Sequence, residues 1–124
     1  MKNIFTYGTI IAFFLLSSFI SVEDIVSAIK NGNASQLSKY IDNTIEITLR
    51  NKSNTYSKSQ AELVLKDFFE NNSVKNFEIL HKGDNESAQF IIGNLVTKNG
   101  DFRTTIYIKQ KEDKLLLQEI RFEK

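Results

Sequence analysis

The chain contains no cysteine and only one histidine, His81, and both facts restrict its chemistry. Without cysteine there is no disulfide framework, no thiolate nucleophile and no sulfur-ligated metal centre. A single histidine cannot supply a multi-histidine zinc or iron site. Glycine-rich phosphate loops, paired metal carboxylates and serine-elbow motifs are absent as well. We therefore expect no metal site and no other cofactor.

An excess of charge of either sign is also missing, because 16 basic residues face 15 acidic ones in 124 residues. Proteins that bind nucleic acid or an anionic membrane surface usually carry a positive excess. The balance therefore indicates that nucleic acid is not a partner. Hydrophobic residues make up 41% and charged residues 25%, which is typical of one globular domain rather than a disordered or fibrous chain.

The longest apolar run, Thr9 to Ile20, lies near the start of the chain, and Lys2 is the only charged residue before Glu23. A positive start, about a dozen apolar residues and then small residues are typical of a secretory signal. We therefore expect residues 1–21 to be a signal peptide and the protein to be exported, either periplasmic or secreted. The alternative is an uncleaved membrane anchor formed by residues 4–20, which would be the only contact with a membrane. A buried N-terminal helix is disfavoured because the run has no polar face.

Residues 22–124 are then expected to form a single domain with three amphipathic helices, two of which come first. The first follows a capping box at residues 21–24. The second begins after Asn33, whose side chain can cap it. The third begins after Ser57 or Ser59, since either serine can act as the N-cap.

Strands are expected on both sides of the third helix. Residues 44–50 alternate between apolar and polar side chains, as a half-buried strand requires, and a polar turn at 51–54 leads into a short returning strand at 55–56. Asn99-Gly100 is the strongest hairpin signal, because a type I′ turn needs two residues that tolerate positive φ. The chain after Ser73 indicates a four-strand antiparallel meander with strands at 74–82, 87–97, 102–111 and 115–123.

The alternation of the last two strands predicts which side of the sheet is covered. One side of each strand is apolar and the other is charged, so the helices should cover one face and water the other. The result is an α+β fold with N-terminal helices packed on one curved antiparallel sheet. The residues expected to face the helices are Phe102, Thr104, Ile106 and Ile108 in the third strand, and Leu116, Gln118, Ile120 and Phe122 in the fourth.

This order of elements resembles the nuclear-transport-factor-2-like (also cystatin-like) superfamily, whose cone-shaped domains enclose a pocket between a curved sheet and a helix. The segments DIVSAIK (24–30), YSKSQAE (56–62), GDFRTT (100–105) and LQEIRF (117–122) look like a small exported bacterial family of unknown function. That narrower resemblance implies a fold and an exported location but no activity. Isomerases and dehydratases of the superfamily need a base inside the cone with an oxyanion donor, and no such pair can be matched here.

The inward rows supply the candidate site. His81 is the one candidate catalytic base, because an imidazole can take up and release a proton near neutral pH. The competing interpretation is a half-exposed histidine at a strand end that bonds to backbone or water. Gln118 and Thr104 interrupt apolar rows, either to recognise a ligand or to bond to the backbone. The predicted ligand-binding residues are Phe77, Ile79, His81, Thr104, Ile106 and Gln118.

The outward row suggests an interface, with Arg103, Tyr107, Glu119 and Arg121 as its residues. The competing interpretation is charge pairing across strands of a solvated sheet. Three functions follow. The leading one is non-catalytic binding of a small apolar molecule or a partner protein. The alternatives are a structural module that forms a homodimer through the outer sheet face, and an isomerase- or dehydratase-like enzyme that uses His81.

Overall fold

The computed structural model describes residues 22–85 and 87–124. The predicted signal peptide at 1–21, and with it the Ser21 cap, lies outside the described residues. No helix in the described ranges is long and apolar enough to cross a membrane.

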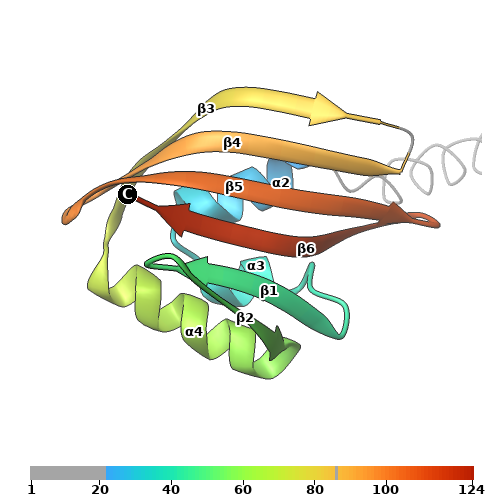
Figure 1. Cartoon of the computed structure of the whole chain (residues 1–124), viewed down its shortest axis with the longest axis horizontal. Helices are drawn as coiled ribbons and strands as arrows, with labels where there is room; N and C mark the ends of the chain where they lie inside the picture. The colour runs from blue at the N-terminus through green and yellow to red at the C-terminus, as the bar shows by residue number, and fades with distance from the viewer. Residues whose placement is uncertain (1–21, 86) are drawn as a thin grey trace, which may run out of the picture.

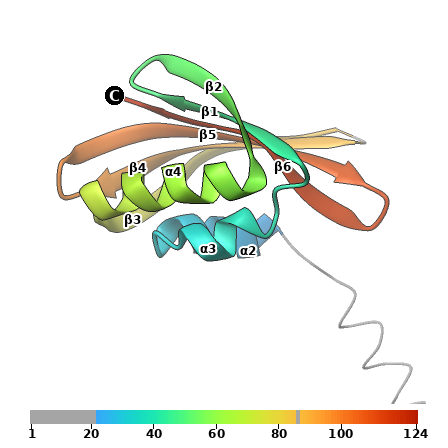
Figure 2. The same cartoon turned by 90° about the horizontal axis from the view of Figure 1, so that it is seen from below.

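Three helices lie on one face of a single curved sheet, as Figures 1 and 2 show, so the predicted α+β fold is confirmed. The sheet has six strands in the order β2-β1-β6-β5-β4-β3. All neighbours pair antiparallel except β1 and β6, which are parallel. The elements are α2 (Val22–Lys30), α3 (Ala34–Ser38), β1 (Thr44–Leu49), β2 (Lys52–Ser57), α4 (Lys58–Asn71), β3 (Val74–Asp84), β4 (Ala88–Thr97), β5 (Gly100–Lys111) and β6 (Lys114–Glu123).

The helix starts follow the capping residues in the sequence. The side chain of Asn33 accepts a hydrogen bond of 3.0 Å from the backbone N–H of Gln36, as predicted. Of the two candidate caps for α4, the structure uses Ser57, whose Oγ accepts from the Gln60 N–H at 3.3 Å. The side chain of Gln60 accepts in turn from the Ser57 N–H at 3.4 Å, which completes a capping box.

The β1–β2 turn lies earlier than predicted. Leu49 pairs with Lys52, so the turn consists of Arg50 and Asn51 alone, with φ of 51° and 65°. The predicted polar turn at 51–54 is therefore wrong, and β2 is a full strand. Asn and Gly are the residues favoured in such turns. A turn at Arg50 was therefore not predicted, because a residue with a Cβ is disfavoured at positive φ.

The hairpin predicted at Asn99-Gly100 is present, but its turn is shifted by one residue. Thr97 pairs with Gly100, so Lys98 and Asn99 form the loop. Gly100 has a φ of 109°, while Asn99 is not at positive φ. The predicted type I′ turn at Asn99-Gly100 is therefore wrong. The side chain of Asn99 is used elsewhere, at the end of α4.

The predicted alternation holds along all of β5 and the second half of β6. Arg103 and Tyr107 are exposed on the outer face, opposite the helices. The inner face and the helices together form one core that includes Ile25, Ile29, Leu37, Ile45, Ile47, Leu65, Ile91, Leu95, Phe102, Ile106, Ile108, Ile120 and Phe122.

Three β-bulges interrupt the alternation elsewhere, one in β6 and two in β3, of which the first, at Lys75, lies near the start of the strand. In β6, Tyr107 pairs with Glu119 but Ile108 pairs with Leu117, so Gln118 is an extra residue. In β3, Ile79 pairs with Gly93 and His81 with Ile92, so Leu80 is an extra residue there. Side chains beyond a bulge point to the opposite face from the one that simple alternation predicts.

Candidate functional site

The predicted pocket residues of β3 and β5 lie inside a packed core. Thr104 and Ile106 have no exposed surface, and Phe77 is 5% exposed. The Thr104 hydroxyl donates to the Phe102 carbonyl oxygen at 3.2 Å, so its polar atom is satisfied within the core. This is the structural role that sequence reasoning allowed for Thr104. Ile79 is half-buried against the same core.

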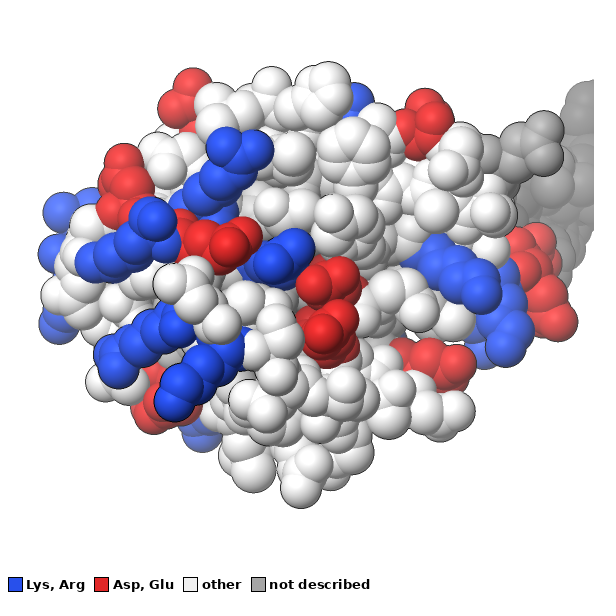
Figure 3. All heavy atoms as spheres, viewed as in Figure 1, with Lys and Arg blue, Asp and Glu red and all other residues white. Residues whose placement is uncertain are grey.

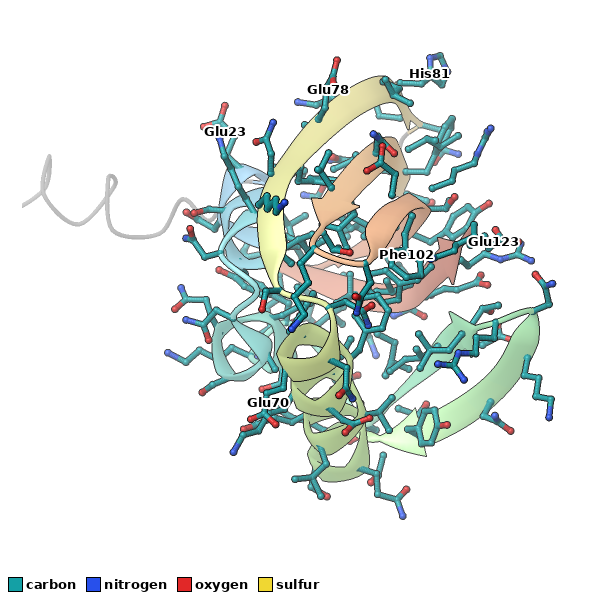
Figure 4. The ribbon with its side chains drawn as sticks, turned by 90° about the vertical axis from the view of Figure 1, so that its left-hand side faces the viewer. Glu23, Glu70, Glu78, His81, Phe102 and Glu123 are labelled. Carbon is teal, nitrogen blue, oxygen red and sulfur yellow. The ribbon has the colours of Figure 1, made fainter. Side chains whose placement is uncertain are left out.

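His81 does not point into the cone, and its predicted inward orientation is wrong. The bulge at Leu80 places His81 opposite Ile92, on the outer side of the sheet, where it is exposed. Figure 4 shows its ring pointing away from the domain. Its ring centroid lies 5.6 Å from that of Phe90. His81 therefore cannot serve as a base inside the cone, which the isomerase- or dehydratase-like hypothesis required.

The inward orientation predicted for Gln118 and Leu116 is wrong for the same physical reason. Gln118 is the extra residue of the β6 bulge and is exposed, while Leu117 takes the inner position with no exposed surface. His81 and Gln118 consequently do not meet in a shared cavity.

The four predicted interface residues do lie along the outer face, with Tyr107 opposite Glu119 and Thr105 opposite Arg121. The charge pairing runs along β6 rather than across strands. Arg121 Nε lies 3.7 Å from a carboxylate oxygen of Glu119 and 3.7 Å from one of Glu123. Burial raises the pKa of Glu119; the neighbouring carboxylates Glu46 and Glu123 add to this, and Arg121 opposes it.

A groove with a volume of about 1070 Å³ lies between α4 and the adjoining ends of β1, β5 and β6. Its apolar floor is formed by Leu49, Val64, Phe68 and Phe102, and Figure 4 shows Phe102 between α4 and the sheet. Phe68 packs edge-on against Phe102, with centroids 5.2 Å apart. Phe68 and Phe102 remain 7% and 8% exposed, respectively, although they belong to the core.

The groove continues along α4 towards β2. A second hollow of about 540 Å³ shares Leu63 and Val64 with the first and adds Tyr56 and Gln60. Leu63 forms part of both walls and is 67% exposed, the largest value among the exposed large apolar side chains of the described residues. We call the two hollows together the α4 groove, defined by Leu49, Arg50, Asn54, Thr55, Tyr56, Gln60, Leu63, Val64, Asp67, Phe68, Asn71, Asn72, Asn99, Phe102 and Lys124.

One end of the α4 groove is closed by a hydrogen-bonded cluster. The Asn99 side-chain amide donates to the Asn71 carbonyl oxygen at 2.6 Å and to the Asn72 side-chain oxygen at 3.2 Å. Lys124 Nζ donates to the Asn99 carbonyl oxygen at 2.9 Å and lies 5.0 Å from the centroid of the Phe102 ring. These contacts tie the end of α4 to the β4–β5 turn and to the residue after β6.

None of the predicted ligand-binding residues lines the α4 groove. The sequence carried only one signal for it. Leu63 and Val64 precede Leu65 directly, so α4 has more apolar residues than its buried face needs. The groove itself depends on the distance between α4 and the β1–β2 hairpin, which no local pattern encodes.

A curved six-strand sheet with helices on one face is the fold of nuclear-transport-factor-2-like domains. An NTF2-like protein of unknown function from Cytophaga hutchinsonii has the same fold, with a TM-score of 0.59 over 82% of this chain and 83% of that one at 6% identity. Such low identity shows the fold alone, and the predicted nuclear-transport-factor-2-like fold is therefore confirmed.

The narrower family follows from residues 22–123, which match the domain of unknown function DUF4783, and the chain belongs to that family. Its fold is close to that of a DUF4783 protein from Bacteroides fragilis, with 34% identity and a TM-score of 0.79 over 86% of this chain and 99% of that one. A second, from Bacteroides uniformis, has 32% identity and a TM-score of 0.81 over 85% and 97%. No match was found among curated proteins.

Proposed function

We propose that this domain binds a small apolar molecule without catalysis, and that the α4 groove is the site. The observation that carries the proposal is the open groove over Leu49, Val64, Phe68 and Phe102, with a volume typical of small-molecule sites. These side chains belong to or border the core, so the floor of the groove is rigid. A preformed apolar surface of this kind reduces the ordering that a ligand must impose on binding.

Leu63 supports the same proposal. A leucine that is 67% exposed gains little from folding, because burial of apolar surface is worth roughly 25 cal/mol per Å². Its position on the wall of the α4 groove gives it a partner once an apolar ligand is bound.

The test uses two leucines that are matched in exposure. N-phenyl-1-naphthylamine, an uncharged fluorophore, should bind the wild-type domain saturably. Leu63→Asp should raise its Kd about fivefold, because a lost apolar contact of this size is worth about 1 kcal/mol. Leu80→Asp, at a residue 61% exposed and outside the groove, should leave Kd unchanged. Equal effects of the two variants, or no saturable binding, would rule out the groove as the site.

The outer sheet face favours a second candidate function, self-association. Figure 3 shows an uncharged area over β3 to β5 on this face, next to charged side chains. Phe90, Ile92 and Val96 are half-buried there and Tyr107 is 41% exposed. Arg103 lies on the same face as the carboxylates around Arg121, so two copies can place opposite charges against each other.

Light scattering tests this second candidate directly. A dimer that becomes a monomer on Tyr107→Asp, and that Leu63→Asp does not affect, would support it. A wild-type domain that stays monomeric at all concentrations, with no change when Arg103 and Arg121 are reversed in charge, would remove it.

A further inference from the structure

Three charged side chains line the α4 groove, and two of them are cations: Arg50 and Lys124 are positive and Asp67 is negative. Because β1 runs parallel to β6 with Leu49 opposite Phe122, Arg50 and Lys124 follow the two strands at the same end of the sheet. Within the described residues the ion pairs are both made by Arg121, so neither Arg50 nor Lys124 forms a salt bridge. Both cations at this end of the groove are therefore available to an anionic ligand.

Arg50 occupies its place at a conformational cost. Its φ of 51° is in the left-handed region, where a residue with a Cβ is disfavoured by about 1 kcal/mol and where turns of this type prefer Asn or Gly. A residue that breaks a local rule commonly does so for function. The exposed side chain of Arg50 lines the groove.

Lys124 is held in place, but its Nζ has hydrogen-bond donors that no group within the described residues uses. Its Nζ makes one hydrogen bond, to the Asn99 carbonyl oxygen, and lies over the Phe102 ring. An ammonium group has three donors, so two remain for a ligand. Its position above Phe102 sets it at the boundary between the apolar floor and the polar end.

We propose that the ligand of the α4 groove is an amphiphile with a single anionic head. Its apolar chain lies on Leu49, Val64 and Phe102, and its head lies between Arg50 and Lys124. This inference rests on the proposed function and adds the class of ligand to it. Charge-assisted hydrogen bonds to the head are roughly twice as strong as neutral ones. The groove should therefore bind an amphiphile with an anionic head more tightly than one with an uncharged head.

The test is a competition in which dodecanoate and dodecanol, below their aggregation concentrations, displace N-phenyl-1-naphthylamine. Dodecanoate should displace the fluorophore at a concentration about tenfold lower than dodecanol, since charge-assisted bonds add at least that factor. The double variant Arg50→Asn with Lys124→Gln should abolish this preference. The control, Lys82→Asn with Lys109→Gln, removes the same charge from exposed residues of β3 and β5 and should retain it.

Two single variants provide readouts that mere loss of structure would not give. Arg50→Asn should weaken dodecanoate binding while raising or preserving the melting temperature, because Asn tolerates the left-handed turn. Asp67→Asn removes the one negative charge and should strengthen dodecanoate binding about twofold to threefold.

The outcomes separate the two proposals. Equal displacement by dodecanoate and dodecanol, with fluorophore binding still sensitive to Leu63→Asp, overturns the anionic head and leaves the groove as a site for an uncharged ligand. Absence of fluorophore binding overturns both proposals. Co-sedimentation with phosphatidylglycerol vesicles, without displacement by dodecanoate, would assign the cations to the surface of a bilayer and would also overturn the bound amphiphile.

Discussion

The ring of Phe68 on α4 stacks on the ring of Phe122 on β6, with centroids 4.2 Å apart and an interplanar angle of 24°. Phe69 meets the same Phe122 ring edge-on at 6.2 Å. The C-terminal half of α4 is thus held against the end of the sheet by aromatic contacts. The α4 groove opens beside this contact, with Phe68 shared between the core and the groove floor.

Truncation of Phe122 should therefore be among the most damaging single changes. Phe122→Ala removes a ring that is 1% exposed and leaves a cavity, which typically costs about 3–5 kcal/mol in the free energy of unfolding. Phe90→Ala, at a half-buried residue of the outer face, should cost only about 1 kcal/mol. Urea denaturation measures both, and comparable losses would contradict the role assigned to the aromatic contact.

The two glycines of the sheet that lie beneath aromatic rings should respond differently to a methyl group. At Gly93 an added Cβ would lie 2.5 Å from the Phe77 ring and 2.8 Å from the Glu78 carbonyl oxygen, so backbone must move. At Gly83 the three nearest atoms all belong to the ring of Phe90, which is half-buried and can rotate outward.

Gly93→Ala should therefore lower the free energy of unfolding by about 1–3 kcal/mol, and Gly83→Ala by less. Thermal and urea denaturation of the two variants test the order. If Gly83→Ala is the more harmful of the two, the rigid contact with the Glu78 carbonyl is not the deciding factor.

The N-terminus of α4 offers a matched pair of serines. Ser57→Ala removes the side-chain acceptor of the Gln60 N–H and should cost about 1 kcal/mol. Ser59→Ala, two residues later and exposed, removes only a long hydroxyl–hydroxyl contact of 3.4 Å to Ser57 and should change stability by no more than about 0.5 kcal/mol. Chemical denaturation of both variants measures these losses of stability. A larger loss for Ser59→Ala than for Ser57→Ala would mean that Ser59, not Ser57, is the cap.

The raised pKa of Glu119 predicts a pH-dependent difference in stability. The folded protein holds the proton of Glu119 more tightly than the unfolded chain does, because of burial and of the carboxylates Glu46 and Glu123. Ionisation of Glu119 therefore lowers stability as the pH rises from the ordinary glutamate pKa, about 4.3, through the raised value.

In Glu119→Gln the glutamine cannot ionise. The melting temperature of this variant should therefore rise relative to that of the wild type as the pH rises through this window. Both melting temperatures should be measured at each pH, because other groups then cancel in the difference. Glu46→Gln provides the comparison, since it removes one source of the raised pKa and should give a difference of the same sign. A difference that is constant with pH would contradict the prediction.

Much of the fold was predictable from local patterns. The cap at Asn33, the buried row of β5 and the short loop between the strands predicted at 102–111 and 115–123 all follow from short-range rules. These features depend on the residue types within a few positions, and local sterics and hydrogen bonding decide them.

The facing of residues near the bulges at Leu80 and Gln118 was not predictable, and the reason lies in the sequence itself. Ile79-Leu80 and Leu115-Leu116-Leu117 are apolar at successive positions, so either phase of the alternation puts a hydrophobic side chain inwards. The pairing with the neighbouring strand then decides which residue is the extra one, and it places His81 and Gln118 outside.

The sequence by itself determined the α+β class, the order of the helices and strands and the apolar inner face, because these follow from periodicity and capping within single elements. Only the tertiary structure decided where a site can form. Leu49, Phe68, Phe102 and Lys124 come from four separate elements or their ends, and they line one groove because the parallel β1–β6 pair and the placement of α4 bring those ends together. The faces of His81 and Gln118 were decided in the same way, since register between strands is a property of their pairing and not of either strand alone.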